Sequence, residues 1–166
     1  MAALTKAQGN LLLKLARKAI EEALQHKTVK VATAVRHKKI FLQQPGVFVT
    51  LLKNGELRGS VGYPEGTYPL IDAVIRAARD AAFSDPRFKA VKKSGLQQLK
   101  IRIDVLSKFK QTGISGIKPR KQGIYVKYGP FKALQLPEDA KKFKWTARQM
   151  IENCLSACAC ARWVSA

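Results

Sequence analysis

The chain has 166 residues, enough for one domain with a substantial core. Hydrophobic residues make up 46% and charged residues 25%, which is typical of a globular protein and argues against a disordered one. Lysine and arginine number 31 against 11 acids, giving a net charge of +20, and with only two histidines the chain is short of parts for most zinc hydrolases and catalytic triads.

The first predicted element is a helix from about Thr5 to Gln25. Thr5 and Gln8 form a capping-box pattern at its start. Apolar residues then recur on one helix face, namely Leu12, Leu15, Ala16, Ala19 and Ala23. The basic stretch from Lys27 to Lys39 contains several β-branched residues, and the pattern leaves its state open.

The strongest local signal is a hairpin. Residues 46–53 are rich in strand-forming residues, and Asn54-Gly55 suits a type I′ turn because both residues tolerate positive φ. Residues 56–62 form the returning strand. The two glycines of that strand, Gly59 and Gly62, permit a bulge or the close approach of another group.

A loop from Tyr63 to Pro69 leads into a second helix, with Pro69 expected in its first turn. The helix runs from Leu70 to about Phe83 and is expected to bury one stripe, made of Ile71, Val74, Ala77, Ala78, Ala81 and Ala82. Residues 99–105 alternate between apolar and polar, which predicts a strand with one wet face.

Residues 113–123 form a loop rich in glycine, proline and lysine. Beyond it, the pattern predicts a strand through Ile124, Val126 and Tyr128, a short strand from Lys132 to Leu136, and a helix that begins at Pro137. A Thr146–Gln149 capping box starts a final helix, whose residues include Met150, Ile151, Cys154, Leu155 and Cys158. This order predicts an α+β fold, mainly an antiparallel sheet flanked by helices, in a single domain of residues 1–166.

The cysteines and the apolar segments bear on location. The chain has no run of about 18 apolar residues and its N-terminus does not have the pattern of a cleaved signal peptide, so no membrane span is expected. All three cysteines, Cys154, Cys158 and Cys160, lie close together, which is not a disulfide framework. They lack a fourth ligand nearby and are read as small buried hydrophobes, so we expect a cytoplasmic protein with neither metal nor cofactor.

The basic residues are unevenly distributed. From Pro86 to Met150 there are 17 lysines and arginines against three acids, and such a field attracts polyanions. The residues predicted to contact nucleic acid are Lys100, Arg102, Lys118, Arg120, Lys121 and Lys127, with Phe131 beside the phosphate track and Tyr125 or Tyr128 stacking on bases. The alternative is a solvated charged surface that reflects the habitat of the organism.

Arg58-Gly-Ser-Val-Gly62 is not a nucleophile elbow, because that pattern has glycine where Arg58 stands. It nevertheless suggests a small anionic-substrate pocket. Its catalytic candidates are Arg58, Ser60 and Glu65, and its ligand-binding candidates are Gly59, Gly62, Tyr63, Asp85 and Arg87. The two arginines would grip a phosphate or carboxylate, and Glu65 would act as a base. The alternative is a structural network in which Asp85 caps a helix and Arg87 pairs with a carboxylate.

Three segments, Gly46–Leu51, Gly55–Pro64 and Ala81–Phe88, resemble the AMMECR domain family, named after the Alport syndrome, mental retardation, midface hypoplasia and elliptocytosis chromosomal region gene. Their order and spacing fit, and the resemblance covers about Thr5 to Trp163. It implies an α/β fold of two unequal lobes and a cytoplasmic or nuclear protein. It implies no established activity, although the family has been linked to nucleic-acid or translation machinery and to Memo-like and radical-SAM-type proteins.

The chain departs from the family pattern at three places. Ser60 stands where the family usually has cysteine, and a hydroxyl is a far weaker nucleophile than a thiolate. Gln122 stands where the family often has histidine or aspartate. Ser156-Ala157-Cys158 replaces a Lys-Ala-Gly sequence. These departures weaken any thiol or metal chemistry.

Three functions follow. The favoured one is a basic module associated with nucleic acid, RNA before DNA, in core cellular or modification machinery. The second is an enzyme or enzyme subunit with the pocket around Arg58, Ser60, Glu65 and Arg87. The third is an adaptor that binds an acidic partner, for which family association suggests a Memo-like or radical-SAM-type protein.

Overall fold

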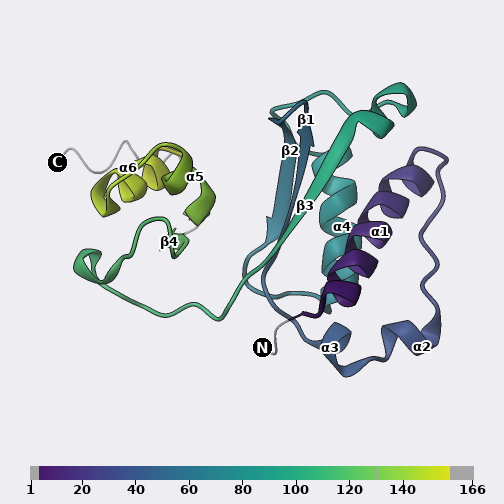
Figure 1. The fold of residues 1–166 in the computed structure, drawn as a ribbon, viewed down its shortest axis with the longest axis horizontal. Coiled ribbons are helices and arrows are strands. Elements are labelled where there is room, and N and C mark those ends of the chain that lie inside the picture. Colours follow the sequence, from purple (N-terminus) through teal and green to yellow (C-terminus); the bar gives the residue numbers. More distant parts are fainter. Residues whose placement is uncertain (1–3, 130, 158–166) are drawn as a thin grey trace. The chain divides into compact units, whose positions relative to one another are not determined.

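The computed structural model describes residues 4–129 and 131–157. The chain divides into two compact units of unequal length, residues 1–108 and 109–166, and each is described by itself (Figure 1). Among the described residues, no helix combines the length and the apolar character that crossing a bilayer requires.

Unit 1 is built on a three-stranded antiparallel sheet in the order β2-β1-β3. Strand β1 spans Val47–Lys53, β2 spans Glu56–Tyr63, and β3 spans Leu99–Val105. Asn54 and Gly55 connect β1 and β2 with φ values of 53° and 85°, as a type I′ turn requires, so the predicted hairpin is confirmed. Strand β3 pairs with the other edge of β1, which makes the first hairpin strand the centre of the sheet.

Two helices, α1 (Lys6–Ala23) and α4 (Leu70–Phe83), cover one face of this sheet (Figure 1). The Thr5–Gln8 capping box at the start of α1 is confirmed. The stripe predicted for α4 is buried throughout, and Leu70 and Ala73 extend it. Pro69 is the N-cap of α4 rather than a first-turn residue, because its ψ of 145° is extended while its carbonyl already accepts from the Ala73 N–H.

The core of unit 1 lies between the sheet and these helices. Val47, Val49 and Leu51 of β1 are fully buried in the same cluster as the α4 stripe. Alternation along the strand places Phe48, Thr50 and Leu52 on the other face. The sheet therefore has one face covered by α1 and α4 and one face that no helix of unit 1 covers.

The stretch after α1, whose state the sequence left open, holds two single-turn helices, α2 (Thr33–Arg36) and α3 (Lys39–Leu42). Its valines pack at the margin of the core, and Phe41 is buried. Both short helices lie at the end of the sheet opposite the β1–β2 turn (Figure 1). The 3₁₀ turn η1 (Lys93–Gln98) lies at the same end as that turn.

Unit 2 is a two-stranded antiparallel hairpin with two helices. Strand β4 spans Ile124–Tyr128, β5 spans Phe131–Gln135, and a short 3₁₀ turn, η2, spans Ile114–Gly116. Helix α5 spans Pro137–Lys142 and α6 spans Ala147–Ala157. The Thr146–Gln149 capping box is confirmed. A small core of Ile124, Ala133, Ala140, Met150 and Cys154 holds the unit together, while Cys158 and Cys160 lie outside the described residues.

Candidate anion-binding site

The site begins with an irregularity in β2. The pairing register shifts between Leu51 and Leu52, which oppose Gly59 and Leu57, so Arg58 is the extra residue of a β-bulge. A bulge turns a side chain away from the direction that strict alternation would give it. The guanidinium of Arg58 reaches the segment after α4, where its Nη2 donates to the Lys89 carbonyl over 2.6 Å.

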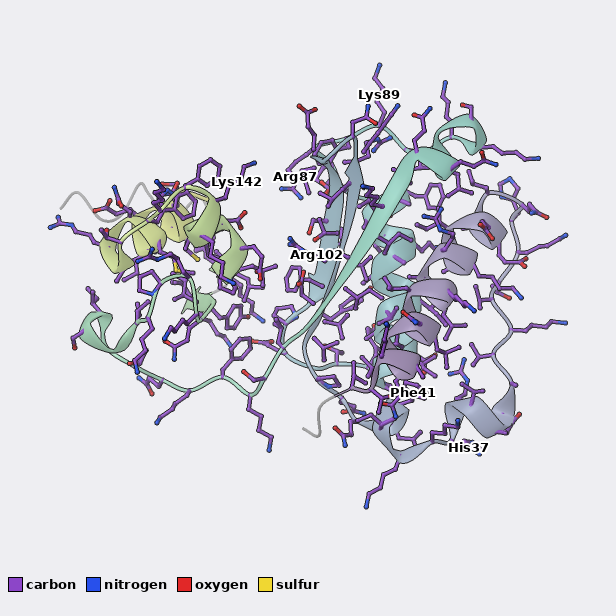
Figure 2. The ribbon with its side chains drawn as sticks, in the orientation of Figure 1. His37, Phe41, Arg87, Lys89, Arg102 and Lys142 are labelled. Carbon is purple, nitrogen blue, oxygen red and sulfur yellow. The ribbon has the colours of Figure 1, made fainter. Side chains whose placement is uncertain are left out.

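A cavity of about 230 Å³ opens beside this arginine. Four of its lining residues are cationic, Lys53, Arg58, Lys89 and Lys92, and the others are Ala90, Val91, Ser94, Gly95 and Leu99. No acid is among them, and the sequence has no aspartate or glutamate from Pro86 to Ile103. Figure 2 shows Lys89 at the end of the sheet that carries the β1–β2 turn. We call this cavity the Arg58 pocket.

One nitrogen of the Arg58 guanidinium lacks a hydrogen-bond partner. Its Nη1 is buried and has no hydrogen-bond partner within the described part of the chain, whereas Nη2 is fixed by Lys89. The centroid of the Phe88 ring lies 5.9 Å from the guanidinium carbon, although Phe88 does not line the cavity. Leaving a charged donor buried and unsatisfied is costly, so an anion that accepted from Nη1 would remove that penalty on binding.

Beside the pocket, Asp85 holds the outer edge of β2. The carboxylate is 5% exposed and accepts from the Ser60 N–H over 2.8 Å and from Arg87 Nη2 over 2.7 Å. Arg87 Nη2 also donates to the Ser60 carbonyl over 3.3 Å. The Arg87 guanidinium holds the pKa of Asp85 at about 2, and the carboxylate in turn raises the pKa of Arg87. The pair thus occupies the backbone groups that a fourth strand would use. Arg87 pairs with a carboxylate, as the structural alternative expected, but Asp85 binds the edge of β2 and does not cap a described helix.

Ser60 lies on the sheet face that α1 and α4 leave uncovered. Its hydroxyl is 3.0 Å from the Thr50 hydroxyl, and Arg102 lies across from Thr50 on β3. Figure 2 shows Arg102 on the side of the sheet away from the helices, where its Nε donates to Asp104 over 3.0 Å. The partner of the Ser60 hydroxyl is therefore another hydroxyl and not a base.

The remaining candidates for the pocket lie on different faces and at different ends of β2. Gly59 faces the helices, where α4 lies directly against it, and Tyr63 faces the same way and donates its hydroxyl to Asp80 over 2.6 Å. Burial, together with this hydrogen bond, raises the pKa of Tyr63 to about 12. Glu65 follows the far end of β2, and the five-residue step from Arg58 to Tyr63 alone spans roughly 16 Å of strand.

The last of these candidates, Gly62, lies on the uncovered face against the Phe48 ring and the Val47 carbonyl. The structure therefore brings Ser60, Asp85 and Arg87 together next to Arg58, and leaves Glu65 apart from them.

The predicted nucleic-acid residues fall into two places. Lys100 and Arg102 lie in alternation on the uncovered face of β3. The others belong to unit 2, where Lys118, Arg120 and Lys121 are exposed on a turn and Lys127 is exposed on β4. Gln122 closes the turn, because its Oε1 accepts from the Lys118 N–H over 2.9 Å. The residue that replaces the family's histidine or aspartate thus has a structural role.

Sequence reasoning named Arg58 but missed Lys53, Lys89 and Lys92 as its companions. One signal was available. The acid-free stretch from Pro86 to Ile103 follows α4 directly, and the Asn-Gly turn places Lys53 and Arg58 at the same end of the hairpin. The glycines of this strand permitted a bulge, but no local pattern showed that the bulge falls at Arg58 and directs this side chain towards Lys89.

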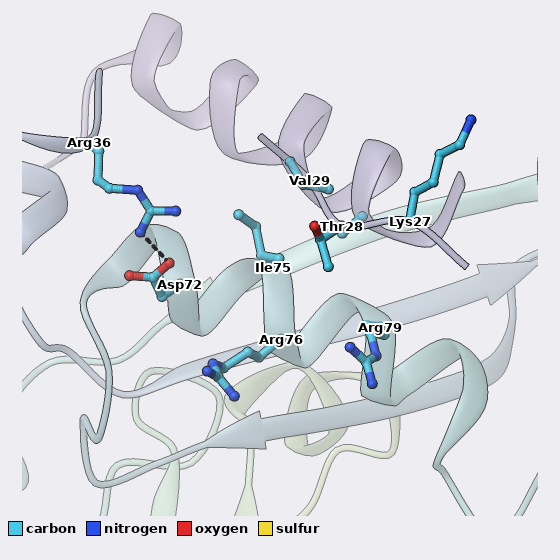
Figure 3. Close-up of a pocket in the computed structure, with 9 residues that line it drawn as sticks. Lys27, Thr28, Val29, Arg36, Asp72, Ile75, Arg76 and Arg79 are labelled. Atoms are coloured by element: carbon cyan, nitrogen blue, oxygen red, sulfur yellow. Dashed lines mark hydrogen bonds and ion pairs between the residues drawn. The ribbon is translucent and has the colours of Figure 1, made fainter. Parts of the chain in front are cut away.

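A second cavity, of about 220 Å³, lies between α4 and the segment after α1 (Figure 3). It is also cationic, with Lys27, Arg36, Arg76 and Arg79 among its lining residues. Asp72 is in the lining too and pairs with Arg36 over 2.6 Å, while Arg76 lies over the Tyr68 ring at 4.6 Å. Lys27 also donates to the Gln25 Oε1 over 3.1 Å. Because three of its four cations already have partners and one of these partners is an acid, this cavity is a weaker anion site than the Arg58 pocket.

Cys154 is the described cysteine. Its side chain is fully buried in the core of unit 2, and burial raises the pKa of the thiol to about 11. The thiol is therefore protonated at neutral pH, as the reading of this residue as a small buried hydrophobe requires.

The comparisons with known proteins decide the family. The AMMECR1 family model matches residues 13–163. The chain belongs to the AMMECR1 family. An AMMECR1-family relative from Methanothermobacter thermautotrophicus is 38% identical, and the match covers 94% of this chain and 85% of the relative. Protein NEQ441 from Nanoarchaeum equitans is 32% identical, with 88% and 85% covered.

The fold agrees with a solved AMMECR1-like structure. The crystal structure of protein PH0010 from Pyrococcus horikoshii matches with a TM-score of 0.82 at 29% identity, covering 91% of this chain and 79% of that one. The predicted family and the predicted mixture of helices and antiparallel sheet are both confirmed. The names of these relatives state no ligand or reaction, so the function has to be argued from the site.

Proposed function

We propose that this AMMECR1-family protein binds RNA, and that the Arg58 pocket holds one phosphate of the bound strand. The observation that carries the proposal is the Arg58 side chain, which lines a cavity together with three lysines and whose buried Nη1 has no partner in the described part of the chain. A phosphate oxygen is the acceptor that such a donor lacks.

The electrostatics favour an anion of high charge. Lys53, Lys89 and Lys92 surround Arg58 with no acid in the lining, so their potentials add at the cavity. The apolar part of the lining, made of Ala90, Val91 and Leu99, keeps the local dielectric constant below that of water and strengthens each interaction. The net charge of +20 raises the concentration of polyanions around the whole molecule.

The geometry favours a single strand. A cavity of about 230 Å³ accepts a phosphate with the sugar attached to it, which a flexible strand can present. A duplex holds its phosphates in a fixed array, so it would have to fit the surrounding surface as well. The preference for RNA over DNA is part of the proposal and is tested with strands of identical sequence.

The test is fluorescence anisotropy with a labelled mixed-sequence single-stranded RNA at low salt. We expect Arg58→Gln to weaken binding roughly tenfold or more, since a charge-assisted hydrogen bond is lost. Lys92→Gln should weaken binding less without unfolding the protein, because the Lys92 side chain makes no hydrogen bond or ion pair in the described structure and its backbone bond from Gly95 is kept. Lys14→Gln on the exposed side of α1 is the matched control and should leave binding unchanged. Equal affinity for all four proteins would remove the pocket from the proposal.

A second candidate is an enzyme or enzyme subunit that takes a small anionic substrate. The adjacent Ser60 and Thr50 hydroxyls, 3.0 Å apart beside the Arg58 strand, are the observation in its favour. It would need a base other than Glu65, which follows the far end of β2. Titration with inorganic phosphate and a nucleoside monophosphate separates the candidates. Saturation by these small ligands, with no gain in affinity for longer RNA, would favour the second one.

A further inference from the structure

Unit 2 carries an exposed aromatic pair that the Arg58 pocket does not use. Phe143 and Trp145 stack with ring centroids 5.2 Å apart and an interplanar angle of 22°. Trp145 is partly buried against the core of unit 2, whereas Phe143 is 54% exposed. The pair thus has an anchored inner ring and a solvent-facing outer ring.

The backbone holds this pair in place. The Phe143 N–H donates to the Asp139 carbonyl over 2.9 Å, and the Trp145 N–H donates to the Ala140 carbonyl over 3.0 Å, so both residues are tied to the end of α5. Directly afterwards, Thr146 caps α6. A stacking surface fixed in this way costs little conformational entropy when a ligand binds.

Lysines surround the exposed ring. Lys141, Lys142 and Lys144 are exposed on both sides of it in the sequence, and Lys142 Nζ lies 5.2 Å from the Phe143 ring centroid. The neighbouring acids, Glu138 and Asp139, stand in the first turn of α5, and Asp139 accepts from Gln135. An apolar protein partner would have to desolvate these lysines. An anionic ligand with aromatic rings satisfies both features at once.

We propose that Phe143 is a stacking platform for a nucleobase of single-stranded RNA, with Lys141, Lys142 and Lys144 on the adjacent phosphates. This inference rests on the proposed binding of single-stranded RNA and adds where a base of that strand lies. A base already paired and stacked in a duplex cannot lie on the ring, so the platform selects single strands.

This platform differs from the aromatic residues that the sequence suggested. Tyr125 is partly buried and stacks on Phe109, with ring centroids 4.6 Å apart at 16°. The side chain of Tyr128 lies outside what the structure describes. Phe143 has the more exposed ring and the denser set of lysines.

The experiment uses Trp145 as its reporter. The chain has two tryptophans, so Trp163→Phe leaves Trp145 as the single emitter in the full-length protein. A single-stranded mixed-sequence RNA should change its fluorescence, and the matching duplex should bind more weakly. Phe143→Ala should lower the affinity for the single strand roughly 5- to 100-fold. Phe143→Tyr should retain it. Ile114→Ala, which removes another exposed apolar side chain of unit 2, is the control and should have no effect.

The outcomes separate this inference from the function on which it rests. If the parent protein binds no RNA, both the proposed function and the stacking platform are contradicted. If it binds RNA while Phe143→Ala binds as tightly as Phe143→Tyr, the platform is overturned and the Arg58 proposal stands. Equal affinity for single strand and duplex also overturns the platform.

Discussion

At the scale of single residues, Asp85 shows how one carboxylate can finish a sheet edge. It joins Ser60 of the edge strand to Arg87, and its own carboxylate is buried although the Arg87 side chain is exposed. A carboxylate with a pKa of about 2 remains ionised at any physiological pH, so it serves as a fixed acceptor and not as a base.

The depressed pKa of Asp85 predicts the acid stability of unit 1. Its folded pKa of about 2 lies below the unfolded value near 4, so the stabilisation is fully present above about pH 4 and is lost as the pH falls towards 2. The contribution is about 2 kcal/mol. We expect urea unfolding to show that Asp85→Asn is less stable than the parent at pH 7. Between pH 2 and 7, the free energy of unfolding of this variant should also change less with pH than that of the parent. An unchanged acid slope in Asp85→Asn would contradict the assignment, and Glu21→Gln on the exposed side of α1 is the control.

The buried thiol of Cys154 makes a second prediction at this scale. With its pKa raised to about 11, the thiolate is scarce at pH 8 and shielded from reagents. In a variant with Cys158→Ser and Cys160→Ser, iodoacetamide should label the folded protein very slowly and the urea-unfolded protein rapidly. Labelling of the folded form at the rate of a free thiol would show that the core of unit 2 opens.

At the scale of elements, the contact of α4 with β2 depends on Gly59. A Cβ at this position would meet the Ala81 carbonyl of α4, and neither backbone can yield without moving a whole element. We expect Gly59→Ala to destabilise the protein by about 1 to 3 kcal/mol, as overpacking does.

The control for Gly59→Ala is a glycine-to-alanine change that should raise the stability of the protein. Gly9 lies inside α1 with open space at its Cβ position, so Gly9→Ala should stabilise the protein by about 0.5 to 1 kcal/mol. Thermal unfolding of both variants measures the two effects. A neutral Gly59→Ala would mean that α4 and β2 lie further apart than described.

The elements also show how far a sequence can be interpreted. The Asn54-Gly55 hairpin, the α4 stripe and both capping boxes were predictable, because turn, periodicity and cap signals are local. The pairing of β3 with β1 depends on residues about 50 positions apart, for which no local pattern exists. The lysines of the Arg58 pocket were not predicted for a similar reason. Lys89 reaches Arg58 only because of the bulge in β2 and the course of the segment after α4.

At the scale of the whole molecule, the cations behind the net charge of +20 differ in whether an acid lies beside them. Arg87 and Arg102 pair with Asp85 and Asp104 and so contribute little to an anion site. The Arg58 pocket, with no acid in its lining, keeps its full positive field. The turn of Lys118, Arg120 and Lys121 adds exposed cations in unit 2. This grouping of cations around a buried donor that has no partner in the described part of the chain is the observation behind the RNA proposal.

The salt dependence of RNA binding tests this account most directly. The affinity of the parent for single-stranded RNA should fall linearly on a log–log plot of affinity against salt, by roughly 0.7 for each phosphate neutralised. Removing two pocket cations in Lys89→Gln/Lys92→Gln should make that slope shallower by up to about 0.7, the share of the one phosphate in the pocket, whereas Lys14→Gln/Lys18→Gln on α1 should leave it unchanged. Parallel lines for the parent and the pocket variant would mean that no phosphate lies in the Arg58 pocket.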